Sequence, residues 1–140
     1  MNAYNRANHA AGAELQGELR DLLSLAVVGD HLRWVVHGDG GELGGWLSDA
    51  IPRWRALADE VAERLVALGV PPDGRVRSLA QDISLNWVPE GWLPADEARR
   101  LLEQRLHTLG AWSRRRRSNT TNPESARVLD AVCKGLARVP

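Results

Sequence analysis

Cysteine, lysine and phenylalanine are scarce in this sequence of 140 residues, which has one cysteine, one lysine and no phenylalanine. A single thiol cannot form an internal disulfide or a multi-thiolate metal site. Leu129, Val132 and Leu136 recur around Cys133 at helical spacing. We therefore expect this cysteine to be a small buried residue of a helix.

Long apolar runs and familiar catalytic motifs are also missing. No stretch approaches the ~18 apolar residues of a membrane span, and no charged-then-apolar leader is present. We therefore expect a cytoplasmic protein with no membrane partner. The formal net charge is zero, so a nucleic-acid partner would need a local basic patch. No Ser-His-Asp grouping, phosphate-binding glycine loop or Cys-His zinc spacing supports other chemistry.

The composition that remains is typical of one folded domain. Apolar residues make up 44% and charged residues 26% of the chain, as in ordinary globular proteins. Residues 1–12 are small and polar without periodicity, which predicts a flexible N-terminal tail. Residues 13–140 are predicted to form the domain.

Helical spacing of apolar residues begins at Ala13. Leu15, Leu19, Leu22 and Ala26 form one stripe, and further apolar side chains spread around the same helix at Leu23, Leu25, Val27 and Val28. One bundle core covers only one stripe of a helix. The first helix is therefore predicted to contribute to a subunit interface as well as to the core.

Three further long helices are predicted along the chain. Steps of three and four residues run from Leu43 to Leu68, and Gly69 is a helix-stop residue. Another helix starts near Pro94, and the last runs from Pro123, with Asn122 as its N-cap, to about Arg138. No strand pattern appears. A connection of about 25 residues, with a short helix within 75–84, separates the second and third long helices, which favours an all-α four-helix bundle with a long crossover.

Several segments together resemble the Dps proteins, the mini-ferritins of bacterial stress and stationary phase. They are "LQGELRDLLSL", "WVVHG", "LADEVAERLVALGVPPDGR", "WLPADEARRLLEQRL" and "NPESARVLDAVCKGL", in this order. "ADEVAERLVALG" followed by "PPDGR" is the most specific. The resemblance implies a ferritin-like domain over residues 13–140, a homo-oligomer in the form of a hollow dodecamer, and storage of ferric iron. It also implies a stress response that limits peroxide damage, often with DNA binding.

The resemblance also implies an iron-oxidising centre between two subunits, and here the sequence departs from the pattern. The expected Asp-x-x-x-Glu pair is present as Asp59 and Glu63, four residues apart on one helical face. The expected histidines are absent, because their positions hold Arg33 and Gly44. The expected third ligand falls on Ser48, with Asp49 one residue away, and Pro52 could change the local winding enough to return Asp49 to the site.

Two hypotheses account for this altered centre. In the first, the Arg33 guanidinium forms an ion pair with Asp59 and Glu63 and replaces the metal. In the second, His37, one helical turn beyond Arg33, is a displaced iron ligand in a rebuilt centre. Without the resemblance, Asp59 and Glu63 would be interpreted as an ordinary solvated helix face.

The only dense charge cluster is "SRRRR", with arginines at positions 114–117. Arginines at the end of a helix are favoured by its dipole and are usually solvated. Repeated around a cage, Arg114, Arg115, Arg116 and Arg117 could instead contact a DNA backbone without reading sequence.

We therefore predict a Dps-like cage subunit for iron sequestration or stress protection of DNA, in the cytoplasm or at the nucleoid. Its oxidising centre is expected to be degenerate, so that the protein is not an enzyme and any iron is stored. The alternative is an active ferroxidase that uses Asp59, Glu63, Asp49 and His37 as metal ligands. A third hypothesis is a helical adaptor that kept the fold but not the cage.

Overall fold

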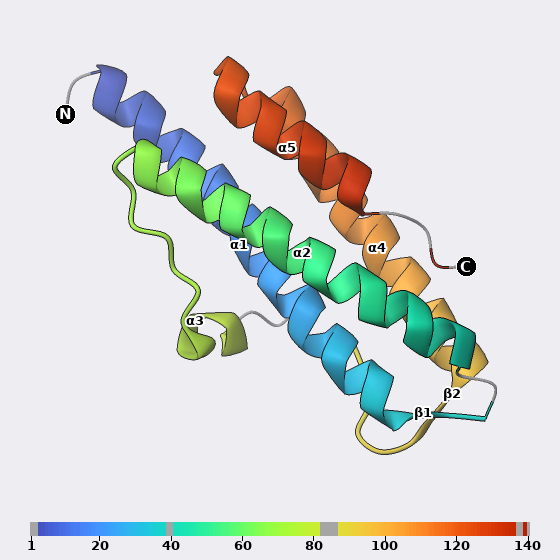
Figure 1. Ribbon diagram of the computed structural model, residues 1–140. Helices are drawn as coiled ribbons and strands as arrows, with labels where there is room; N and C mark the ends of the chain where they lie inside the picture. The colour runs from blue at the N-terminus through green and yellow to red at the C-terminus, as the bar shows by residue number, and fades with distance from the viewer. Residues whose placement is uncertain (1–2, 39–40, 82–86, 137–138, 140) are drawn as a thin grey trace.

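A computed structural model describes residues 3–38, 41–81, 87–136 and 139 of the chain. Four long helices form an antiparallel bundle: α1 (Ala3–Val35), α2 (Gly41–Ala67), α4 (Ala95–Ser118) and α5 (Pro123–Gly135) (Figure 1). The connection from α2 to α4 runs along the bundle and carries the short helix α3 (Val76–Ala80). This arrangement confirms the expected all-α class, the four helices and the crossover helix. Within the described residues, no helix combines the length and apolar character needed to span a membrane.

The first helix begins ten residues earlier than the sequence predicted. Residues 3–12, expected to be part of a flexible tail, are helical and continue directly into the rest of α1. Alanines at 10, 11 and 13 favour a helix, and the buried Gly12 brings the helix close to the segment after α2. A Cβ at Gly12 would lie only 2.9 Å from Cγ2 of Val70.

The predicted end of α2 and the predicted start of α5 are confirmed. Gly69 has a φ of 77°, the left-handed conformation that ends many helices. The Asn122 side chain accepts hydrogen bonds from the backbone N–H groups of Glu124 (3.0 Å) and Ser125 (3.1 Å), and Pro123 is the first residue of α5. The last helix ends at Gly135, and Arg138, its expected end, lies outside the described residues.

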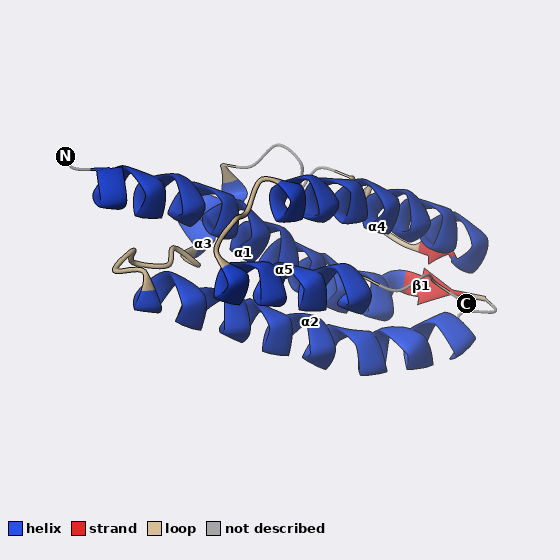
Figure 2. Cartoon of the chain, turned by 90° about the horizontal axis from the view of Figure 1, so that it is seen from above, coloured by secondary structure: helices blue, strands red, loops and turns tan. Residues whose placement is uncertain are grey.

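Two very short strands were not predicted. β1 (Val36–His37) pairs in parallel with β2 (Leu93–Pro94), with Val36 opposite Leu93. The pairing joins the end of α1 to the start of α4 at the end of the bundle remote from the N-terminus (Figure 2). Two residues are too few for a strand pattern to be visible in a sequence.

The bundle core consists of two clusters of buried side chains along its length. Trp54 lies in the cluster nearer the strands, in edge contact with Trp46 at a centroid distance of 5.8 Å. The second cluster, nearer the N-terminus, joins α1, α2 and α5. Buried residues of α2 continue at steps of three and four through Pro52, at Leu43, Leu47, Ala50, Trp54, Ala58, Val61 and Leu65, and Ile51 widens the buried stripe next to the proline. The helix therefore does not change its winding at the proline.

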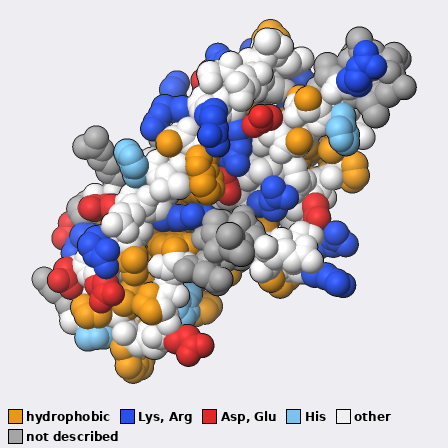
Figure 3. Space-filling view, turned by 180° about the vertical axis from the view of Figure 1, so that it is seen from behind, with side chains coloured by type: hydrophobic (Ala, Val, Ile, Leu, Met, Phe, Trp, Pro, Cys, Tyr) orange, Lys and Arg blue, Asp and Glu red, His pale blue; other side chains and the backbone are white. Residues whose placement is uncertain are grey.

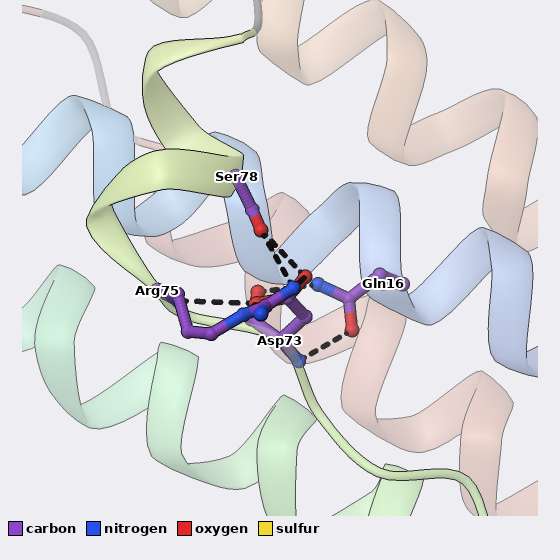
Figure 4. A network of polar contacts seen from close by, with 4 residues as sticks. All are labelled: Gln16, Asp73, Arg75 and Ser78. Atoms are coloured by element: carbon purple, nitrogen blue, oxygen red, sulfur yellow. Dashed lines mark hydrogen bonds and ion pairs between the residues drawn. The ribbon is translucent and has the colours of Figure 1, made fainter.

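The crossover is fastened to the bundle at its start. The Gln16 amide of α1 donates to the Asp73 backbone carbonyl (2.7 Å) and accepts from the Asp73 backbone N–H (2.8 Å) (Figure 4). The Asp73 carboxylate in turn accepts from the Arg75 side chain (2.9 and 3.1 Å) and from Ser78 (2.6 Å). These contacts fix the path of the chain into α3.

The end of the crossover is fastened by aromatic contacts. The Arg105 guanidinium of α4 lies 6.0 Å from the Trp87 ring and 5.6 Å from the Trp112 ring. A guanidinium over aromatic faces at these distances is a favourable cation–π contact. The contact holds the segment before α4 against the side of that helix.

Candidate functional site

The acidic pair predicted on the second helix lies on the outer face of α2. Asp59 and Glu63 are both exposed, four residues apart. Ala58, Val61 and Leu65 fill the inner face of the same turns. Because these apolar residues fix the rotation of the helix, both carboxylates are accessible from outside the protomer.

Two arginines, one on α1 and one on α2, share one aspartate of α1. Arg33 Nη2 is 3.1 Å from Oδ1 of Asp30, and Arg55 Nη2 is 3.4 Å from Oδ2 of the same residue. Sequence reasoning identified Arg33 but missed Arg55. The spacing could have revealed it, because Arg55 precedes Asp59 by four residues and so lies on the same face of α2.

Exposed apolar side chains flank this charged group. Val27 precedes Asp30 by three residues and Trp34 follows it by four, so all three share a face of α1. Val66 follows Asp59 by seven residues on α2. Val27 is 53%, Trp34 67% and Val66 65% exposed. We call this surface, made by Val27, Asp30, Arg33, Trp34, Arg55, Asp59, Glu63 and Val66, the α1–α2 face.

The expected ligand positions early in α2 do not join the acidic pair. The Ser48 hydroxyl donates to the Gly44 carbonyl at 2.9 Å, within the same helix. Asp49 is exposed, and regular winding through Pro52 leaves it about 100° around the helix from position 48. The helix thus shows no change of winding that would turn Asp49 toward the acidic pair, and the role of Asp49 as a ligand stays a prediction.

His37 lies on a different element from the one assumed for it. Helix α1 ends at Val35, and His37 belongs to β1, where it is the register partner of Pro94. Its expected position one helical turn beyond Arg33 is therefore wrong, because the backbone has already become extended. The side chain is exposed, and its role as a ligand stays a prediction.

One protomer alone does not supply a fitting iron site. Among the described residues, no group of three or more His, Cys, Asp or Glu side chains could hold a metal ion. Asp59 and Glu63 are two carboxylates from one helix, and the arginines at 33 and 55 pair with Asp30. Any iron at Asp59 and Glu63 would need further ligands from a second protomer.

A second acidic group, not predicted from the sequence, lies inside the bundle. Arg116 Nη1 of α4 donates to Oε2 of Glu18 and to Oδ2 of Asp21, both at 2.7 Å, and the Ser113 hydroxyl donates to Oε1 of Glu18. Glu18 is 1% and Asp21 6% exposed. Burial raises the pKa of Glu18, although the hydrogen bonds from Ser113 and Arg116 oppose this shift. We call Glu18, Asp21, Ser113 and Arg116 the interior network.

This network divides the arginine run predicted as a DNA-binding cluster. Arg116 points into the bundle, and Arg117 pairs with Asp130 at 2.8 Å. Arg114 and Arg115 remain exposed. The expectation that four arginines form one surface patch is therefore wrong for Arg116, which forms ion pairs with two carboxylates of α1. The involvement of the other three in DNA binding stays a prediction.

The arrangement of helices has clear relatives among solved structures. No protein-family profile matches the sequence, and no curated protein matches it either. The structure is similar to Dps from Mycobacterium smegmatis in its tetragonal form, with a TM-score of 0.88 and 20% identity over 94% of this chain and 82% of that chain. The chain has the ferritin-like fold of the Dps proteins.

Two further solved structures support the Dps fold. Dps from Microbacterium arborescens in the high iron form has a TM-score of 0.83 and 22% identity, and the match covers 93% of this chain and 87% of that chain. Dps from Vibrio cholerae, described as a member of a broad superfamily of ferritin-like diiron-carboxylate proteins, has a TM-score of 0.83 at 12% identity over 94% and 85% of the two chains. The TM-scores of these matches establish the shared fold.

Proposed function

We propose that this chain is the subunit of a Dps-like cage that sequesters iron and protects DNA under stress, with an oxidising centre that has lost its function. The α1–α2 face is the observation that supports this proposal. It presents an acidic pair, two arginines and exposed apolar side chains on one surface of a Dps fold. We infer that two protomers associate through this face.

Self-association accounts for the apolar side chains of the face. Val27, Trp34 and Val66 are more than half exposed, and burying the part of each that is still exposed would contribute about 1–2 kcal/mol. A two-fold interface uses the same surface of both protomers. Each copy would then present its own arginines to the carboxylates of the other copy.

An ion pair is the proposed replacement for iron within this interface. Arg33 and Arg55 are 37% and 48% exposed in their side chains, so each retains donors for a second carboxylate beyond Asp30. Guanidinium groups neutralise carboxylates with directed hydrogen bonds. Asp59 and Glu63 of one protomer and the arginines of the other would thus be satisfied without a metal ion.

Mass in solution tests the assembly. Sedimentation equilibrium is expected to give a species near twelve times the chain mass of 15.4 kDa. Trp34→Glu should reduce the mass to that of smaller species, because it places a charge in an apolar contact. Ala111→Glu, an equally drastic change at an exposed position of α4, is the matched control and should assemble. A monomeric wild-type protein would overturn the cage and favour a helical adaptor.

An iron assay tests the lost oxidising centre. Wild-type protein is expected to show no saturable oxidation of ferrous iron by peroxide or dioxygen. The ion-pair hypothesis fails if oxidation is saturable and Asp59→Ala abolishes it. Glu60→Ala, at the exposed position next to Asp59, is the control and should leave such oxidation intact. The ferroxidase alternative with Asp59 and Glu63 would then hold, and Asp49→Ala and His37→Ala would show whether those residues complete the centre.

DNA binding is tested by its dependence on salt. Backbone contacts weaken steeply as salt rises because counterions are released. A retardation of DNA that weakens in the double variant Arg114→Ala, Arg115→Ala would support contact through the exposed arginines. The absence of any retardation at low salt would remove DNA from the proposed function.

A further inference from the structure

A groove between α4 and α5 is separate from the α1–α2 face. It is an open cavity of about 690 Å³, lined on one wall by α4 from Glu103 to Arg114 and on the other by Cys133 and Leu136, with Val139 at its edge. Leu106 and Val139 are 5% and 8% exposed and belong to the bundle core. The groove therefore has an apolar floor that continues the core outward.

The size of the groove suits a small molecule. Ligand sites are commonly cavities of about 300–1,000 Å³ with apolar walls and a few polar groups that fix orientation. Here the apolar walls come from both helices, and among the described lining residues the ionisable side chains of Glu103, His107 and Arg114 all belong to α4. The groove therefore combines an apolar bed with one charged rim.

Arg114 supplies a positive charge to this rim. A Cβ placed on Gly110 would lie 3.3 Å from Nη1 of Arg114, so the guanidinium folds back over the glycine, along the wall of the groove. Arg116 and Arg117 each pair with a carboxylate. No ion pair joins Arg114 to another residue in the described parts of the chain. Its charge is available to an anion that enters the groove.

Glu103 gives the groove a polarity along its length. It precedes Arg114 by eleven residues on α4, which corresponds to about 16 Å along the helix axis. A carboxylate on a ligand would be attracted at the Arg114 end and repelled at the Glu103 end. The charges of the groove are thus complementary to a molecule with one anionic end and an uncharged apolar body.

We propose that the α4–α5 groove binds a single-chain carboxylate amphiphile, with its head group on Arg114 and its alkyl chain against Leu106, Leu136 and Val139. This binding would be a second property of the protein, at a place apart from the α1–α2 face. The alkyl chain would cover the apolar floor, and the guanidinium would bind the carboxylate through two of its donors.

The only cysteine of the chain offers a direct measurement, because Cys133 is partly buried and lines the groove. Burial raises the pKa of this thiol, so labelling with a maleimide is best followed at mildly alkaline pH. Decanoate, below its micelle concentration, is expected to slow the labelling in a saturable way. Dodecanoate should bind more tightly than octanoate, because each further CH₂ is buried, and decanol should bind more weakly than decanoate.

Matched variants distinguish the groove from general association with the surface. Arg114→Ala should weaken decanoate binding about tenfold or more, since it removes a charge-assisted contact. Arg115→Ala, its exposed neighbour outside the groove, should leave binding unchanged. Equal binding by wild type and Arg114→Ala, or no protection of Cys133 by decanoate, would overturn the proposal.

A second copy of the chain could occupy the groove instead, and the same assay detects it. Cys133 would then label slowly without any ligand and faster after dilution to the dissociated protomer. This result would also overturn the proposal. Protection of Cys133 by decanoate and its loss in Arg114→Ala do not depend on iron oxidation or on the mass of the assembly, so the groove and the proposed function can fail separately.

Discussion

Two acidic groups of this protein have the same residue types and opposite surroundings. In the interior network, Glu18 and Asp21 are buried and bind one arginine of α4 at 2.7 Å. On the α1–α2 face, Asp59 and Glu63 are exposed, and the nearby arginines bind Asp30 instead. The first group is neutralised within the protomer. The second has carboxylates whose counter-charge is expected from another copy.

The difference indicates what each group contributes. Buried charges are tolerated only when paired and hydrogen-bonded, so the interior network is part of the folding of this chain. Exposed charges cost little to leave in water, so folding alone does not explain an acidic pair that shares a face with exposed apolar residues. On the side of the molecule seen in Figure 3, charged and hydrophobic side chains are interspersed. The α1–α2 face is better explained by association than by stability.

Removing the central arginine of the interior network should give the largest effect. Arg116→Met would leave Glu18 and Asp21 buried without a counter-charge, and the free energy of unfolding should fall by about 3–5 kcal/mol. Urea denaturation followed by circular dichroism measures it. Arg117→Ala, which breaks the exposed pair with Asp130, is the matched control and should cost about 0–1 kcal/mol. Similar losses for the two variants would contradict the buried role of Arg116.

Neutralising the two carboxylates that bind Arg116 should change the free energy of unfolding in opposite directions at neutral pH. The pKa of Glu18 is raised by burial, so the folded state binds its proton more tightly than the unfolded state does. The stability that Glu18 contributes is therefore lost as the pH rises above the ordinary pKa of a glutamate side chain. Glu18→Gln should match wild type in acid and become more stable than wild type at neutral pH. Asp21→Asn removes a partner of Arg116 and should destabilise by about 1–3 kcal/mol at neutral pH.

Urea denaturation at pH 4.5 and pH 7 measures this contrast, with wild type as the reference at each pH. The outcome depends on the difference between variant and wild type, because other carboxyl groups titrate in both proteins. A Glu18→Gln variant that is less stable than wild type at pH 7 would show that the Arg116 contact outweighs the cost of burying the charge.

Much of the fold could be predicted from the sequence because it depends on local signals. Apolar residues spaced three and four apart predicted α2 and α4, and Asn122 followed by Pro123 predicted the start of α5. The start of α1 was missed because alanine and polar residues form a helix without an apolar stripe. The β1–β2 contact was missed because its two strands are 57 residues apart and two residues long.

The candidate site was harder to predict because its contacts are not local. Arg116 looked like its neighbours in "SRRRR", although it continues the inner stripe of α4 through Leu102, Leu106, Leu109 and Ser113 at steps of three and four. Its partners are 95 and 98 residues away. Conversely, Asp59 and Glu63 were predicted from a resemblance, and their partners lie outside the single protomer.

Asp73, in the crossover, should show a pH dependence of stability opposite to that of Glu18. Hydrogen bonds from the Arg75 side chain and from Ser78 hold the pKa of Asp73 well below its usual value. A carboxyl group with a depressed pKa contributes stability at neutral pH that is lost as the pH falls. The thermal midpoint of Asp73→Asn should therefore lie below that of wild type at pH 7, and the difference should begin to narrow as the pH falls from 4 to 3. A constant difference across this range would show that the crossover contacts act without the carboxylate charge.

The smallest effect on folding is expected at the α1–α2 face. Because Asp59 and Glu63 have no carboxylate contact within the described part of the protomer, Asp59→Asn with Glu63→Gln should change the stability of the dissociated protomer by about 0.5 kcal/mol or less. In the assembled protein the same variant should unfold at lower urea concentrations than wild type, because association stabilises the folded state by mass action. The difference between the two proteins should therefore grow with protein concentration. A difference that does not depend on concentration would place the contribution of these carboxylates within one chain, as in the interior network, and would remove the reason to expect arginines from a second copy.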